Sequence, residues 1–104
     1  MQEVLAIEIL SAGGLSASAV FFADHLETAR HKLSQPGVSA LAIALPAATS
    51  EQDDWRRSLA RDLAREYAPK RVNVIGGSGA GLRETLAYLR DAPGVTGQYI
   101  ALDE

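Results

Sequence analysis

Apolar residues along the chain form four short runs that are separated by three longer amphipathic stretches. The runs cover residues 4–10, 38–45, 72–75 and 98–102. Short apolar runs with β-branched residues are typical of strands, and a run that is apolar on both faces indicates a strand covered on both sides of its sheet. We therefore expect the run at residues 38–45 to be central, and the runs at residues 4–10 and 98–102 to be edges.

The three intervening stretches have the spacing of helices. The first helix begins near Ser16 or Ser18, either of which could cap it, and ends before residues 35–37, Gln-Pro-Gly. Its apolar stripe consists of Phe22, Leu26, Ala29 and Leu33. The third helix has Leu82, Leu86 and Leu89 on one face and ends before Pro93.

The second helix, predicted over residues 53–68, has the strongest pattern. Acidic residues occupy its start, where the helix dipole favours them, and Pro69 ends it. Large apolar residues recur every four positions, at Trp55, Leu59, Leu63 and Tyr67. Ala60, Ala64 and Ala68 form a row of small residues beside them, and Arg56, Arg57, Arg61 and Arg65 take the remaining faces.

Strands and helices thus alternate as β-α-β-α-β-α-β. Helical crossovers of this length imply parallel strands, so we expect an α/β fold with a four-stranded, mainly parallel sheet in chain order. The chain has 104 residues and no linker or repeat, which fits a single domain over residues 1–104, in two or three layers.

Composition narrows the possible functions. The net charge of −3 argues against a nucleic-acid binder, and the absence of cysteine excludes disulfides and thiolate metal sites. No apolar run approaches the ~20 residues that span a bilayer, and the start lacks the features of a signal peptide. We expect a cytoplasmic protein that binds neither nucleic acid nor membrane.

Two short motifs near the end of the chain carry a family resemblance. Residues 71–73 read Arg-Val-Asn and are followed by Ile75, while residues 95–98 read Val-Thr-Gly-Gln and are followed by Ile100 and Asp103. In this order and spacing they resemble the C-terminal half of the short-chain dehydrogenase/reductase family. The resemblance implies a Rossmann-like domain that lacks the first half of the family's fold.

The resemblance does not extend to the family's reactive groups. Its Tyr-x-x-x-Lys pair falls on Pro46 and Ser50, or on Ser50 and Asp54, and neither register supplies a tyrosine or a lysine. The nearest counterpart of its dinucleotide turn, at residues 11–14, has only two glycines. We therefore expect no catalytic residues, no bound cofactor and no dehydrogenase activity, as in a degenerate member of the family.

A glycine-rich loop at residues 76–81 is the one feature that could bind a ligand. It lies between a strand and a helix, where backbone N–H groups can bind an anion or phosphate. Its candidate binding residues are Gly76, Gly77, Ser78, Gly79 and Gly81. The alternative is a turn that is rich in glycine for conformational reasons alone. No metal site is expected, because His25 and His31 are six residues apart and lie on different helix faces.

Two function classes remain open. The first is a non-catalytic assembly or binding module whose partner is a second copy or a full-length dehydrogenase. We expect a homodimer with Trp55, Leu59, Leu63 and Tyr67 at the interface, although the same stripe could lie inside the monomer core. The second class is a small-ligand protein, with or without enzymatic activity, that uses the glycine-rich loop for a phosphate or nucleotide.

Overall fold

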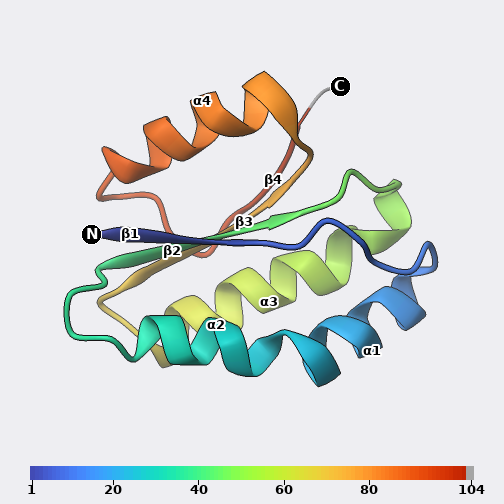
Figure 1. Ribbon diagram of the computed structural model, residues 1–104, viewed down its shortest axis with the longest axis horizontal. Coiled ribbons are helices and arrows are strands. Elements are labelled where there is room, and N and C mark those ends of the chain that lie inside the picture. The colour runs from blue at the N-terminus through green and yellow to red at the C-terminus, as the bar shows by residue number, and fades with distance from the viewer. Residues whose placement is uncertain (103–104) are drawn as a thin grey trace.

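The computed structural model describes residues 1–102, which form a parallel sheet with helices on both faces (Figure 1). The strands are β1 (Gln2–Ala6), β2 (Ala40–Leu45), β3 (Arg71–Gly76) and β4 (Tyr99–Ala101). They lie side by side in chain order, and every neighbouring pair is parallel. The predicted sheet, with β2 inside and β1 and β4 at the edges, is confirmed.

The helices give the fold three layers. They are α1 (Gly14–Asp24), α2 (Leu26–Leu33), the short 3-10 helix η1 (Ser50–Gln52), α3 (Asp53–Glu66) and α4 (Gly79–Arg90). Figure 1 shows α1, α2 and α3 on one face of the sheet and α4 on the other. No helix within residues 1–102 is long and apolar enough to cross a membrane.

The first strand is shorter than the run of apolar residues predicted. The Ile7 N–H still donates to the Ala44 carbonyl at 2.8 Å, but the chain then leaves the sheet and Ile9 is 86% exposed. In this parallel register the next ladder bond requires an N–H at residue 46, and Pro46 has none. The prediction of a strand to residue 10 was therefore wrong beyond Ala6.

The single helix predicted before Leu33 is two helices that meet at His25. The buried residues are Ala17 and Phe21 in α1, and Ala29 and Leu33 in α2, all spaced by multiples of four. At 3.6 residues per turn, a four-residue spacing drifts by about 40° at each step. A change of direction at His25 keeps both halves against the sheet, with Phe21 rather than Phe22 buried.

The sheet has a separate apolar core on each face. The larger core joins β2 and β3 to Phe21, Leu33, Leu59 and Leu63 of the three helices below the sheet. The smaller core joins Ala42 and Ile75 to Leu89 of α4. Every residue of β2 is buried, as the continuous apolar run predicted.

Asn73 fixes the connection that leads into β4. Its side-chain amide donates to the Val95 carbonyl at 3.0 Å and accepts from the Gln98 N–H at 3.1 Å. The Thr96 hydroxyl accepts the Val72 N–H at 3.0 Å. The strand and the Val-Thr-Gly-Gln motif are thus held together by side chains of both motifs, so the role of Asn73 is structural.

Candidate functional site

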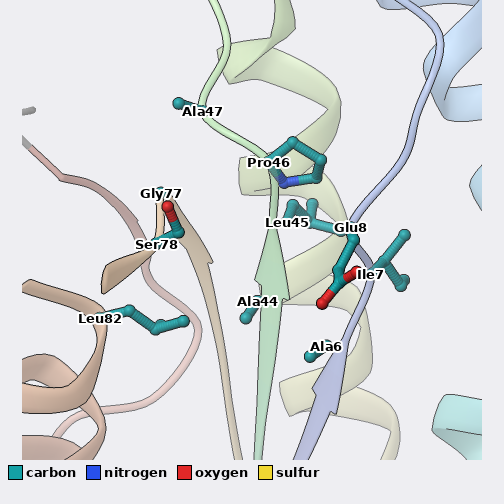
Figure 2. Close-up of a pocket in the computed structure, with 10 residues that line it drawn as sticks. All are labelled: Ala6, Ile7, Glu8, Ala44, Leu45, Pro46, Ala47, Gly77, Ser78 and Leu82. Carbon is teal, nitrogen blue, oxygen red and sulfur yellow. The ribbon is translucent and has the colours of Figure 1, made fainter. Parts of the chain in front are cut away.

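The carboxyl ends of β1, β2 and β3 open into a pocket of about 380 Å³ (Figure 2). Ligands of open parallel α/β sheets bind at this edge, and small-molecule pockets begin at roughly 300 Å³. The pocket is lined by Ala6, Ile7, Glu8, Ala44, Leu45, Pro46, Ala47, Gly77, Ser78 and Leu82. Its walls are therefore largely apolar, with few polar groups.

Two polar side chains stand on opposite sides of this pocket. Figure 2 shows Glu8 on the β1 side of the end of β2 and Ser78 on the β3 side. Glu8 is exposed, so its carboxylate remains hydrated and can accept hydrogen bonds from a ligand. The same carboxylate repels an anion that enters the pocket from this side.

The glycine-rich loop is divided between structural and accessible residues. The Gly76 carbonyl accepts the Leu102 N–H at 2.8 Å, and the Gly77 N–H donates to the Leu45 carbonyl at 2.9 Å. Both glycines are buried, and these two backbone groups already have partners within the fold. Of the five candidate residues, Ser78, Gly79 and Gly81 are exposed, where α4 begins. The part of the predicted loop that can meet a ligand is therefore its second half.

A second pocket, of about 390 Å³, lies beside the first and shares Pro46 and Ala47 with it. The residues that line it are Leu10, Ser11, Ala12, Pro46, Ala47, Ala48, Thr49, Glu51, Gln52 and Arg56. The side chain that distinguishes it is Arg56, which is 1% exposed. A charged residue with so little exposure requires partners.

The partners of Arg56 are neutral. Its Nη1 donates to the Pro46 carbonyl at 2.9 Å and to the Tyr99 hydroxyl at 3.2 Å, and its Nη2 donates to the Gln52 side-chain oxygen at 3.3 Å. Its guanidinium carbon lies 5.5 Å from the Trp55 ring centre and 5.6 Å from that of Tyr99. No carboxylate of residues 1–102 forms an ion pair with it.

Gly76 makes room for this arrangement. A Cβ at Gly76 would lie 2.5 Å from the Tyr99 hydroxyl and 2.9 Å from Nη1 of Arg56. The glycine that ends β3 thus allows Tyr99 and Arg56 to meet on the face of the sheet that α3 covers. Its conformational freedom is not needed, since its φ is not positive.

The sequence prediction missed Arg56 and Tyr99. It placed Arg56 on an outer face of the helix, whereas the structure buries it in line with Ala60 and Leu63. The signal was present, because positions 56, 60 and 63 have the i, i+4, i+7 spacing of one helix face. A charged residue on the apolar face was the cue for a buried cation.

The stripe predicted as a dimer interface lies largely in the monomer core. Leu59 and Leu63 are each 2% exposed, while Trp55 and Tyr67 are partly buried against the same core. Burial in the monomer accounts for both leucines without a partner, which corresponds to the alternative that the sequence left open. The row of alanines faces different surroundings, with Ala60 buried and Ala68 exposed. The homodimer itself stays a prediction.

The positions that match the family's catalytic pair surround the start of α3. Pro46 lines both pockets, and Ser50 begins η1. Asp54 is exposed, and its Oδ1 lies 3.7 Å from Nη1 of Arg57. Tyr67 lies at the opposite end of α3 and caps it. Among the described residues, no group of three histidine, aspartate or glutamate side chains could hold a metal ion.

A family model described as short chain dehydrogenase-like protein (SDR-like) matches residues 5–102 of the chain. The match spans nearly the whole sequence, so the chain belongs to this family, in agreement with its Arg-Val-Asn and Val-Thr-Gly-Gln motifs. Asp103, the last residue of the resemblance, lies outside the described residues. No curated protein and no solved structure matches the chain.

Proposed function

We propose that this short-chain dehydrogenase-like chain is a non-catalytic binding module that takes a small ligand at the carboxyl edge of its sheet. The observation that carries the proposal is the apolar pocket between Glu8 and Ser78, which has no tyrosine and no lysine in its lining. The proposal keeps the cytoplasmic setting expected from the sequence.

The two lysines of the chain support a non-catalytic role. Lys32 pairs with Glu3 at 3.3 Å, and Lys70 donates to the carbonyls of Leu33 and Gln35 at the end of α2. Both are engaged away from the pocket lining. Proton transfer at a carbonyl needs an acid or base whose pKa lies near the operating pH. An aliphatic hydroxyl such as that of Ser50 or Ser78 does not meet this need unless a base activates it.

The lining also suggests the chemistry of the ligand. Apolar walls favour a flat or hydrocarbon body, and the Glu8 carboxylate favours hydroxyl or amine donors. A phosphate group would have to lie away from Glu8, at the exposed Ser78 and Gly79 where α4 begins. A nucleoside or a nucleotide meets these requirements, with its hydroxyls at Glu8.

Thermal unfolding with and without ligand tests this proposal. Adenosine or its monophosphate should raise the melting temperature in a saturable way, since a ligand at ~100 times its Kd adds roughly 2.7 kcal/mol of stability. Glu8→Gln should reduce this effect, whereas Glu84→Gln, an exposed change on α4, should leave it unchanged. If adenosine raised the melting temperature equally in the natural protein, Glu8→Gln and Glu84→Gln, the ligand would bind elsewhere.

The non-catalytic part of the proposal has its own test. At micromolar concentration NAD and NADP should show no saturable binding beyond that of adenosine monophosphate when followed by fluorescence. Turnover of any carbonyl substrate with either cofactor would overturn this part and leave the ligand site untouched.

The assembly role remains a second candidate because β1 is an edge strand with exposed apolar neighbours. Val4 on β1 is 38% exposed and Ile9 just beyond it is 86% exposed. Open strand edges pair readily with other chains. A second copy of the chain or a full-length dehydrogenase would be the partner, and co-purification with such an enzyme would favour this candidate.

A further inference from the structure

Arg56 is a buried cation whose surroundings hold too few acceptors. A guanidinium has five N–H donors, and three of them have partners, at Pro46, Tyr99 and Gln52. The Nε atom is buried and has no partner among residues 1–102. Burial of an incompletely bonded charge destabilises a fold, so this arrangement needs a reason.

The neighbouring side chains cannot supply the missing acceptor. The Gln52 side-chain oxygen already accepts from Trp55 Nε1 and from Arg56 Nη2, both at 3.3 Å. The Gln52 amide nitrogen donates to the Ala12 carbonyl at 2.8 Å, which fixes the oxygen on the side of Arg56. Two donors thus share one oxygen at long distances. The aromatic rings attract the cation but accept no charge-assisted hydrogen bond of ordinary strength.

We propose that the pocket beside Arg56 binds a compact oxyanion, a carboxylate or phosphate group, that pairs with the guanidinium. Arg56 lines this pocket, and guanidinium groups bind carboxylates and phosphates through two parallel N–H bonds. Nε is buried as the side chains stand, so the oxyanion would pair with the Nε–H and an Nη2–H by displacing the Gln52 side-chain oxygen, whose bonds to Trp55 and Arg56 are both 3.3 Å long. Ser11 and Thr49 line the same pocket, and a hydroxyl is a side-chain donor that an anion can accept from.

The rim of the pocket favours a single negative charge. Glu51 also lines it and is exposed, so its carboxylate repels an incoming anion through solvent. This repulsion is stronger for a phosphate dianion than for a carboxylate. The site therefore prefers a carboxylate, presented by a small acid or by a larger ligand whose end reaches Arg56.

This site is separate from the ligand pocket proposed above, with which it shares only Pro46 and Ala47. The inference does not rest on the proposed function. Glu8→Gln, which should weaken nucleoside binding, should leave the response to acetate unchanged. Either proposed site can therefore be refuted without affecting the other.

Nitrogen-15 NMR of the whole chain tests the site directly. Acetate and inorganic phosphate are titrated separately at constant ionic strength, set with sodium chloride, and the arginine Nε–Hε signals are followed. The Arg56 signal, assigned by its loss in Arg56→Lys, should shift in a saturable way, at lower concentration for acetate than for phosphate. The signal of Arg57, whose side chain is 54% exposed on the same helix, should not. An Arg56 signal that stays unchanged with both anions would overturn the proposal.

Matched variants separate binding from a structural role. Acetate should raise the melting temperature of the natural protein and of Arg57→Met, and should have no such effect on Arg56→Met. Glu51→Gln should bind acetate roughly two- to fivefold more tightly, the range expected for removal of one exposed charge. An Arg56→Met protein that acetate stabilises as much as the natural protein would refute the site. If Arg56→Met does not fold, the Arg56 signal of the natural protein decides the question.

Discussion

Substitution of Gly76 by alanine adds one methyl group where β3, α3 and β4 meet, and should disturb the packing of Arg56 and Tyr99 there. The added Cβ would lie 2.5 Å from the Tyr99 hydroxyl, 2.9 Å from Arg56 Nη1 and 3.3 Å from a ring carbon of Tyr99. Ordinary contacts lie near 3.5–4.0 Å, so at least one neighbour must move. Both atoms are side-chain ends, but Arg56 is buried and the half-buried Tyr99 packs against the core, which limits how far either can move.

The expected loss of stability follows from these contacts. Extra methyl groups forced into packed regions cost about 1–3 kcal/mol. The Arg56–Tyr99 hydrogen bond is the contact nearest to the new methyl, and loss of a bond to a charged group adds about 1.5–3 kcal/mol. We expect Gly76→Ala to lower the free energy of unfolding by roughly 2.5–4 kcal/mol, the lower part of the sum of these two effects.

Urea unfolding followed by Trp55 fluorescence measures this change, with Gly37→Ala as the control. A Cβ at Gly37 meets nothing within 4 Å, so that variant should be neutral or more stable by up to about 1 kcal/mol. Tyr99→Phe removes the atom at 2.5 Å and should recover part of the loss in the double variant. Equal stabilities of Gly76→Ala and Gly37→Ala, or strictly additive effects with Tyr99→Phe, would contradict the steric reasoning.

Four further outcomes are expected. Leu63→Ala should lower the free energy of unfolding by about 2–5 kcal/mol in urea melts, because Leu63 is 2% exposed within the core; a change below 0.5 kcal/mol would place it at the surface. Asn73→Ala should cost about 1–3 kcal/mol and speed amide exchange of Gln98, whose N–H it binds; unchanged exchange there would argue against this role. The hydrogen bond and positive charge of Arg90 hold the pKa of Asp91 below its ordinary value, so Arg90→Gln should raise that pKa in an NMR titration. Light scattering at micromolar concentration should give about twice the monomer mass, and a monomer would refute the homodimer.

The sequence alone determined the order and direction of the strands. Continuous apolar runs such as residues 40–45 are stable only when covered on both faces, and crossovers of helical length join parallel strands. The strongest helix was predicted for the same reason, since its large residues recur at helical spacing. The spacing of apolar residues shows which side chains are buried away from water. Here that spacing was sufficient to predict the sheet and the helices that cover it.

Periodicity could not determine where an apolar residue finds its cover. Ile9 continues the first apolar run but is exposed, because the neighbouring strand reaches Pro46 and offers no further N–H. Leu59 and Leu63 suited an interface or a core equally well, and only the packing of α3 on the sheet places them in the core. The sequence of one element does not show which other element packs against it.

The site depended most on tertiary structure. Gly76, Arg56 and Tyr99 come from three elements. They meet because Tyr99, the first residue of β4, places its hydroxyl beside Gly76 at the end of β3 and Arg56 near the start of α3. The glycine-rich loop was found from sequence, but its division into a bonded half and an exposed half was not, because partners such as Leu45 and Leu102 lie more than 20 residues away along the chain. A site built from residues far apart in the sequence exists only once the chain has folded, so no single segment predicts it.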